Sequence, residues 1–252
     1  MKVTFLGTGT SQGVPVIACK CDVCLSIDER DKRLRSSVLI EIEGFNFVID
    51  SGPDFRQQML RENVEKLDAI IFTHEHKDHI AGLDDIRAFN YFHKKPMDVY
   101  AEKRVEEALR MEFSYVFAKE YPGIPEILVH NIENKTFKLN NFEIIPIRTL
   151  HAKLPILGFR IKDFTYITDS NYISDEEKQK IIGTKILVID ALRQRKHLSH
   201  FNLEEALLMI EELKPEKAYL THVSHMLGKY VDVQKTLPAN VFLAYDGLKL
   251  EM

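Results

Sequence analysis

The sequence predicts an α+β fold with two mixed β-sheets, each covered by helices on one face. Short apolar runs occur in pairs joined by tight turns in both halves of the chain, which is typical of β-hairpins. Amphipathic segments with helix-capping residues lie between these pairs and indicate helices. Two such sheets packed face to face would form a four-layer αββα sandwich. The chain has no long linker and no internal repeat, so we expect one domain over residues 1–252.

The elements of the first half follow from local patterns. Apolar runs bounded by polar or turn-forming residues predict strands at residues 3–6, 38–43, 45–50 and 69–72. Gly44 supplies the turn between the second and third of these strands. Pro53 favours a helix start before residues 54–62, because the first turn of a helix does not need the N–H that proline lacks. Helical spacing of apolar residues predicts two more helices, over 80–92 and 102–120.

The second half continues with hairpins and capped helices. The Asn140-Asn141 turn predicts a hairpin over residues 136–149, and a second strand pair is expected at 158–161 and 165–168. Two residue pairs have capping-box spacing and begin helices that end at 182 and 213: Ser174 with Glu177, and Asn202 with Glu205. Apolar strands are predicted at 186–190 and 218–221. A final hairpin turn is predicted at Asp246-Gly247.

The composition limits the class of protein. Apolar residues make up 45% of the chain, and no apolar run approaches the ~18 residues that a membrane span needs. The chain opens on a strand-like run without a charged and apolar leader, so no membrane association and a cytoplasmic location are expected. The net charge of −4 makes nucleic acid an unlikely partner, because nucleic acids usually select a basic surface. A small phosphorylated substrate stays compatible, since bound cations can supply a local positive field.

The most informative motif is the run His-x-His-x-Asp-His at residues 74–79, directly after a predicted buried strand. Imidazole and carboxylate groups together suit zinc, manganese or iron. In an extended loop His74 and His76 point the same way, because side chains alternate every second residue. Asp78 and His79 must then serve another position, so the spacing predicts two adjacent metal ions. The competing interpretation is a polar surface loop.

Four more potential metal-binding residues follow short apolar strands, where scaffolds usually place catalytic groups: Asp50, His151, Asp169 and His222. Taken singly, each aspartate fits a helix cap or a turn, and each histidine fits an ordinary surface position. Their joint occurrence at strand ends predicts that they complete two metal-coordination spheres.

The three cysteines form a second candidate metal site. Cys19, Cys21 and Cys24 are clustered, and an odd, clustered set argues against a disulfide framework. Three thiolates at this spacing can fill three corners of a tetrahedral zinc site, which then needs one more ligand. His225, three residues after His222, is the candidate for that ligand. Redox-active thiols and incidental cysteines are the alternatives.

The ordered set of these motifs resembles the metallo-β-lactamase superfamily over the whole chain. The resemblance implies the αββα fold and one metal held by His74, His76 and His151. It places a second metal on Asp78, His79 and His222, with Asp169 between the two and Asp50 supporting a ligand histidine from behind. Within the superfamily, the glycine-rich residues 7–15 and the cysteine run resemble the cyclic phosphodiesterases of the carbon–phosphorus lyase pathway. In that branch the cysteines and a histidine at the position of His225 hold a structural zinc.

The resemblance implies a dinuclear zinc or manganese phosphodiesterase that cleaves a small, cyclic phosphodiester by attack of a metal-bridging hydroxide. His200 is expected to be the general acid, with His197 as its local competitor, and Asp78 to act at the catalytic centre. His93 and His130 are expected at the surface. The alternatives are a nuclease that processes RNA 3′ ends and a metal-dependent hydrolase of another ester or amide bond. The oligomeric state is open, with a homodimer as one candidate.

Overall fold

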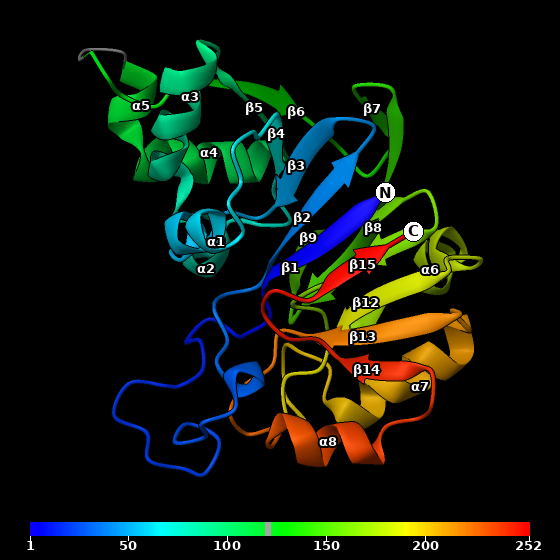
Figure 1. The fold of residues 1–252 in the computed structure, drawn as a ribbon. Coiled ribbons are helices and arrows are strands. Elements are labelled where there is room, and N and C mark those ends of the chain that lie inside the picture. The colour runs from blue at the N-terminus through cyan, green and yellow to red at the C-terminus, as the bar shows by residue number, and fades with distance from the viewer. Residues whose placement is uncertain (119–121) are drawn as a thin grey trace. The chain divides into compact units, whose positions relative to one another are not determined.

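The computed structural model describes residues 1–118 and 122–252 and contains two mixed β-sheets with associated helices (Figure 1). The chain forms two compact units. Unit 1 comprises residues 1–7, 34–133 and 247–252, and unit 2 comprises residues 8–33 and 134–246. The prediction of a single domain over 1–252 stays a prediction.

The sheet of unit 1 has seven strands in the order β15-β1-β2-β3-β4-β5-β6. Their bounds are β1 Lys2–Gly7, β2 Ser37–Ile42, β3 Phe45–Ile49, β4 Ala69–Ile71, β5 Met97–Ala101, β6 Ile127–Asn131 and β15 Lys249–Glu251. β1, β2, β3 and β15 pair antiparallel, whereas β3 to β6 pair parallel. Glu43 and Gly44 both have positive φ (50° and 80°) between β2 and β3, as a two-residue hairpin turn requires.

The helices of unit 1 follow its parallel strands. They are α1 Phe55–Arg61, α2 Lys77–Ile80, η2 Leu83–Ile86, α3 Arg87–His93, α4 Lys103–Glu112 and α5 Ser114–Ala118. Their apolar side chains form one buried cluster with strands of the sheet, which includes Val48, Phe55, Ile70, Phe89 and Leu109. A helical cover over one face of a mixed sheet therefore agrees with the sequence prediction.

The sheet of unit 2 has the order β11-β8-β9-β10-β12-β13-β14, and β7 pairs with β8. Its strands are β7 Phe137–Leu139, β8 Phe142–His151, β9 Leu154–Ile161, β10 Phe164–Tyr166, β11 Tyr172–Ile173, β12 Ile186–Asp190, β13 Lys217–Thr221 and β14 Val241–Leu243. The strands from β10 to β14 along this path pair parallel. The carboxyl ends of these parallel strands therefore lie at one edge of the sheet. Residues from several segments can form a site there.

The helices of unit 2 are η1 Glu29–Asp31, α6 Asp175–Ile181, α7 Leu203–Leu213 and α8 Tyr230–Thr236. Buried aliphatic residues of α6 to α8 pack with those of β12 to β14. The predicted capping box of α7 is complete, because Asn202 accepts from Glu205 N and Glu205 accepts from Asn202 N. At α6 only Ser174 caps, since the Glu177 carboxylate accepts instead from Arg148 N, Asn134 and Lys180.

Three sequence predictions were wrong in detail. Residues 80–92 form α2, η2 and α3 rather than one helix, because the chain passes close to another segment at Gly82. A Cβ added to Gly82 would lie 2.1 Å from the carbonyl oxygen of Gly52, so only glycine fits there. The predicted helix 102–120 divides into α4 and α5 where Phe113 leaves the helical conformation, and residues 119–120 lie outside the described part.

The Asp246-Gly247 turn does not close a hairpin. β14 pairs with β13 in one sheet and β15 pairs with β1 in the other, so this turn leads from sheet to sheet. The sequence analysis also did not predict β5, β6, β11, β14 and α8.

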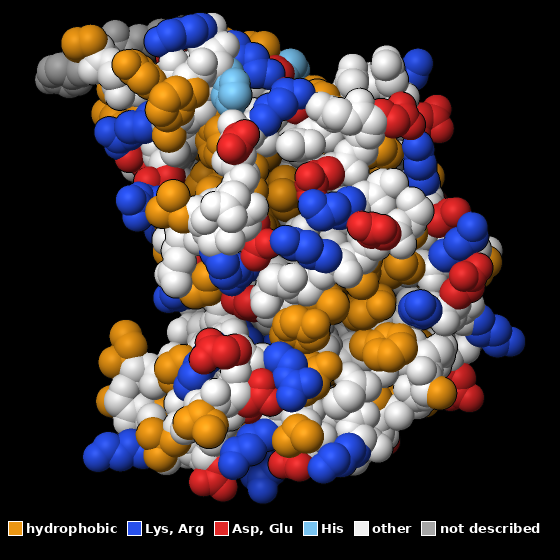
Figure 2. All heavy atoms as spheres, in the orientation of Figure 1, with side chains coloured by type: hydrophobic (Ala, Val, Ile, Leu, Met, Phe, Trp, Pro, Cys, Tyr) orange, Lys and Arg blue, Asp and Glu red, His pale blue; other side chains and the backbone are white. Residues whose placement is uncertain are grey.

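In the described part of the chain, no helix is long and apolar enough to cross a membrane. Lysine and arginine side chains are interspersed with acidic ones on the face shown in Figure 2, so this face has no extended basic area.

Candidate metal centre

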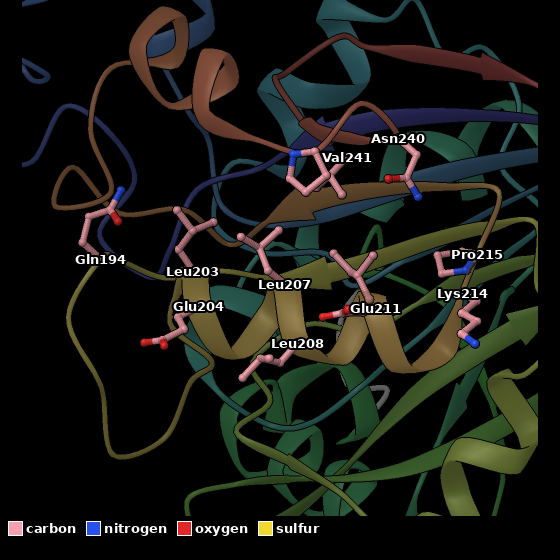
Figure 3. A pocket seen from close by; sticks show the side chains of 12 residues that line it. Gln194, Leu203, Glu204, Leu207, Leu208, Glu211, Lys214, Pro215, Asn240 and Val241 are labelled. Atoms are coloured by element: carbon pink, nitrogen blue, oxygen red, sulfur yellow. The ribbon is translucent and has the colours of Figure 1, made fainter.

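In unit 2, a groove of about 900 Å³ runs along α7 (Figure 3). Its lining is mostly aliphatic and includes Leu203, Leu207, Pro238 and Val241. None of the predicted metal ligands lines it, so the candidate site has to be found from the polar side chains themselves.

In unit 1 the predicted ligands gather at the end of β4. His76 is the N-terminal cap residue of α2, and Asp78 and His79 lie in its first turn rather than in an extended loop. The ring of His74 lies 4.6 Å from that of His76 and 4.2 Å from that of His79, between centroids. The six-residue run therefore brings three imidazoles and one carboxylate together within a single unit.

Asp50, at the end of β3, holds this loop from behind. Its carboxylate is fully buried and accepts from His79 Nδ1 at 2.7 Å, Thr73 N at 2.8 Å and Thr73 Oγ1 at 2.8 Å. Burial raises the pKa of Asp50, and the contact with His79 opposes that rise. The structure thus places Asp50 behind a histidine.

These contacts also fix the histidine tautomers. His79 donates through Nδ1 to Asp50, which leaves the lone pair of its ring on Nε2. The single proton of Thr73 Oγ1 goes to Asp50, so the 2.9 Å contact between Thr73 Oγ1 and His74 Nδ1 has the histidine as donor. His74 therefore also carries its lone pair on Nε2. Hydrogen bonding of the second ring nitrogen is typical of metal-ligating histidines.

A close approach of two backbone segments positions the same loop. A Cβ added to Gly52 would lie 2.0 Å from the carbonyl oxygen of Asp78, and Gly82 N donates to Ser51 O at 2.8 Å. Glycine at position 52 therefore lets the turn after β3 pack directly against α2.

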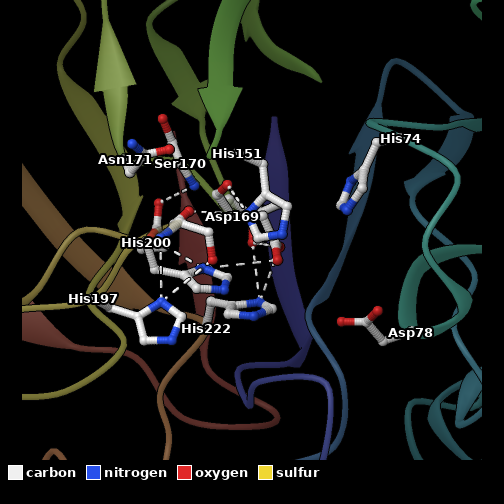
Figure 4. A network of polar contacts seen from close by, with 12 residues as sticks. His74, Asp78, His151, Asp169, Ser170, Asn171, His197, His200 and His222 are labelled. Carbon is white, nitrogen blue, oxygen red and sulfur yellow. Dashed lines mark hydrogen bonds and ion pairs between the residues drawn. The ribbon is translucent and has the colours of Figure 1, made fainter. Parts of the chain in front are cut away.

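In unit 2 the predicted site residues come from three strand ends and one loop (Figure 4). His151 ends β8, Asp169 follows β10, His222 follows β13, and His200 lies in the loop before α7. Ligand atoms of His151, Asp169 and His200 all lie within 4.8 Å of one another, and His222 Nδ1 lies 3.1 Å from Asp169 Oδ2. His151 donates through Nδ1 to the carbonyl oxygens of Asp169 and Ser199, both at 2.9 Å, so its lone pair is on Nε2.

His200 is buried, 8% exposed, whereas His197 is half-buried beside it. The rings of His200 and His222 are stacked with centroids 5.0 Å apart, and His151 lies 4.6 Å from His200. Burial, followed by the charge of His222, lowers the pKa of His200 to about 3. Of the two candidates for the general acid, His200 is the one inside the cluster. In unit 1, His93 and His130 are partly buried; His93 contacts Glu65 O and His130 contacts Asp98.

Asp190 is a member of this cluster that the sequence analysis treated only as the end of an apolar strand. It is fully buried, Oδ1 accepts from Ser170 N at 2.9 Å, and Oδ2 faces His200 Nδ1 at 3.8 Å. Burial raises its pKa well above the ordinary value. Asp190 ends an apolar strand, and Asp50 follows one. This shared sequence signal could have identified Asp190.

The separations within each unit fit divalent metal ions. Two ligand atoms on one tetrahedral zinc ion are about 3.3 Å apart when each metal–ligand distance is about 2.0 Å. The distances between Asp78 Oδ2 and His79 Nε2, 3.2 Å, and between Asp169 Oδ2 and His222 Nδ1, 3.1 Å, are close to that value. The chain therefore carries His/Asp clusters of the kind that hold divalent metals.

The predicted cysteine site also assembles, entirely within unit 2. His225 Nδ1 lies 3.3 Å from Cys19 Sγ, 3.3 Å from Cys21 Sγ and 3.5 Å from Cys24 Sγ. A tetrahedral zinc ion would separate sulfur and nitrogen ligands by about 3.5 Å. Hydrogen bonding from Cys24 N lowers the pKa of Cys21 to about 6, and burial raises the pKa of Cys24 to about 11. The donor set fits one tetrahedral metal ion.

Comparisons with known proteins agree with this geometry. A family model described as the β-lactamase superfamily domain matches residues 45–223. A crystal structure of a diphosphatase from the PhnP family is 38% identical, with a TM-score of 0.93, and the match covers 99% of this chain and 96% of that one.

Curated relatives also match in sequence. An octanoyltransferase of Porphyromonas gingivalis is 39% identical over 99% of this chain and 51% of its own length. A ribonuclease Z of Methanococcus maripaludis is 28% identical over 74% of this chain and 55% of its own length. The chain thus spans about half the length of these curated relatives. Together with the strand-end His and Asp clusters, the family match shows that this chain belongs to the metallo-β-lactamase superfamily and has its fold.

Proposed function

We propose that this chain is a metal-dependent phosphodiesterase that hydrolyses a small, cyclic phosphodiester. The observation that carries the proposal is the set of histidines whose Nδ1 atoms are already hydrogen-bonded: His74 to Thr73, His79 to Asp50, and His151 to two carbonyl oxygens. Each of these rings presents Nε2 as a metal ligand in a fixed orientation. The likeness to a PhnP-family diphosphatase supports chemistry at phosphorus.

In this proposal His74, His76 and His151 hold one divalent ion, Asp78, His79 and His222 hold the other, and Asp169 serves both. When bound, such a pair of ions supplies a water of lowered pKa and neutralises charge on phosphoryl oxygens. Asp50 and Thr73 keep two ligand imidazoles oriented before any ion arrives. Zinc and manganese are both compatible with these ligands, and the cysteine cluster is proposed to hold a structural zinc.

His200 is proposed to donate a proton to the leaving sugar oxygen. Its Nδ1 faces the carboxylates of Asp190 at 3.8 Å and Asp169 at 3.9 Å, which would hold the ring so that Nε2 is the transferring nitrogen. The negative charges of these carboxylates and of a bound phosphodiester favour the protonated ring, against the effect of burial. A positioned general acid contributes about 10²–10⁴-fold to a rate.

The test is turnover of bis-p-nitrophenyl phosphate and of cyclic phosphates by protein loaded with zinc or manganese. We expect hydrolysis that disappears with a chelator and returns with added metal. Absence of turnover on every phosphodiester at full metal occupancy would refute the proposal.

A second candidate is cleavage of RNA ends, which the ribonuclease Z relatives favour. It requires binding to a polyanion, so RNA affinity should fall steeply with salt concentration. The same substrate panel should include an RNA with an unprocessed 3′ end. It should also include an octanoyl thioester, because one relative is named an octanoyltransferase and hydrolysis of another ester is an alternative to be tested.

A further inference from the structure

One short segment of unit 2 carries a donor of each of its two clusters. His222 follows β13 directly and contacts Asp169, while His225, three residues later, contacts all three cysteines. The two candidate metal sites are therefore joined by the two residues between these histidines, Val223 and Ser224.

The backbone of His222 is in a conformation that its neighbours have to maintain. Its φ is 54°, in the left-handed region, which is unfavourable for a residue with a Cβ. Its side chain is only 1% exposed, so a change of its backbone angles would move the imidazole within a packed interior. The position of this ring thus depends on what holds the residues on either side.

On the N-terminal side the sheet holds the chain, because Ala191 N donates to Thr221 O at 3.0 Å. On the C-terminal side the restraints come from loops. Val223 N donates to Thr8 O at 2.8 Å, Thr10 N donates to Val223 O at 3.2 Å, and Ser224 N donates to Leu192 O at 3.0 Å.

The loop that supplies two of these restraints has little regular structure of its own. Within residues 8–33, all of which the structure describes, there is one 3-10 turn, η1, and isolated bridges at Gly9 and between Val14 and Arg33. Backbone amides of this loop point at the thiols instead, since Val16 N donates to Cys24 Sγ and Cys24 N donates to Cys21 Sγ. Arg33 adds a hydrogen bond from Nη1 to Thr8 Oγ1.

We propose that the cluster of Cys19, Cys21, Cys24 and His225 is a positioning device for His222, so that a metal ion in this cluster sets the metal affinity of the His/Asp donors. It acts by two routes: His225 fixes the chain after His222, and the cysteines order the loop that clamps Val223. The inference rests on the proposed function, because it assumes that His222 is a metal ligand.

The test separates this role from simple loss of stability. His225→Ala removes the fourth ligand, and His225→Cys offers a thiolate in its place, since four cysteines also hold zinc. Ile210→Val, at a buried position of α7, serves as a control that should lower stability modestly without contact to either cluster. Each protein is loaded with Co²⁺, whose thiolate absorption reports the cysteine cluster. The Kd of the His/Asp donors is measured by competition with a chromophoric chelator.

We expect His225→Ala to raise that Kd by about 10–100-fold, as loss of an outer partner of a metal site does. His225→Cys should restore both the thiolate absorption and the Kd, and Ile210→Val should lower Tm with the Kd unchanged. If His225→Ala does not fold, Cys19→Ser, which keeps His225 and two cysteines in the cluster, should raise the Kd by a smaller factor. A variant that loses the thiolate absorption and keeps the wild-type Kd overturns the inference. Wild-type protein that binds only the thiolate-ligated Co²⁺ would instead overturn the proposed function.

Discussion

The two units hold imidazoles and carboxylates near one another in different ways. In unit 1 the donors come from one six-residue run, and buried Asp50 contacts His79 directly at 2.7 Å. In unit 2 they come from separate strand ends, and buried Asp190 faces His200 at 3.8 Å. A local run needs one anchored loop, whereas donors from separate strand ends need the whole mixed sheet of unit 2 and its loops. The unit 1 donors should therefore tolerate changes elsewhere in the fold better than the unit 2 donors.

The largest expected effect comes from removing a proposed metal ligand among the donors of unit 2. Asp169→Ala should abolish detectable metal-dependent hydrolysis, because this carboxylate contacts His222 and is proposed to serve both ions. The loss is measured by the turnover rate, and the metal content of the variant by mass spectrometry. Lys77→Ala is the control, since Lys77 is exposed and lies between ligands of the run. Activity in Asp169→Ala close to that of Lys77→Ala would show that Asp169 is not a ligand.

Replacing the proposed acid should affect rate and not metal binding. His200→Ala should lower kcat by about 10²–10⁴-fold on a substrate with a poor leaving group, with metal content unchanged. His197→Ala, at the half-buried neighbour, should have little effect. Loss of metal together with activity in His200→Ala would mean that His200 is a ligand.

The two buried carboxylates offer a matched pair. Asp50→Asn should weaken metal binding by about 10–100-fold, because the carboxylate orients His79, a proposed ligand. Asp190→Asn should leave the metal Kd unchanged and lower kcat, since Asp190 faces His200 and not a proposed ligand. Isothermal titration with zinc and steady-state kinetics on both variants decide this. Equal losses of metal affinity in the two variants would show that the two buried carboxylates do not have different roles.

The smallest expected effect is on the pH dependence of the free energy of unfolding. Asn131 and the cations Arg110 and Lys103 lower the pKa of Glu106 in α4 to about 2, from an ordinary 4.5. A lowered pKa means that the stabilisation is complete above the ordinary value and is lost as pH falls through the folded-state value. Glu106→Gln should therefore lose about 1.5–3 kcal/mol at pH 7 and have a flatter stability profile between pH 5 and 2.

Urea unfolding at pH 7 and pH 3 tests this, with Glu177→Gln as the counterpart in unit 2, where the carboxylate joins α6 to β8. Parallel pH profiles for wild type and Glu106→Gln would contradict the assignment.

The sequence predicted best what is local. The histidine run and the cysteine run are contiguous, and the turn at Glu43-Gly44 and the capping box of α7 depend on a few neighbouring residues. The separate donors Asp50, His151, Asp169 and His222 could be predicted only because each follows an apolar strand. Their assignment to two metal ions came from the resemblance to a family. The tautomers of His74 and His79 could not be predicted from the sequence. They depend on hydrogen bonds to Asp50 and on which acceptor takes the single hydroxyl proton of Thr73.

Other features depend on contacts between segments far apart in sequence. The break at Gly82 comes from its approach to Gly52, and no local propensity encodes that distance. The Asp246-Gly247 turn was read as a hairpin from its residue types, although its two strands pair with different partners. Asp190 was missed because a carboxylate after an apolar strand has an ordinary interpretation until a histidine is found opposite it.

The pairing of β15 with β1 bears on how the protein is made. Lys2 to Thr4 pair with Lys249 to Glu251, so β1 acquires this neighbour only after all the residues between the two strands have been synthesised. Until then that edge of the sheet exposes unpaired backbone groups to other nascent chains. Expression with the last six residues removed should therefore yield aggregated protein even though every candidate ligand is still present.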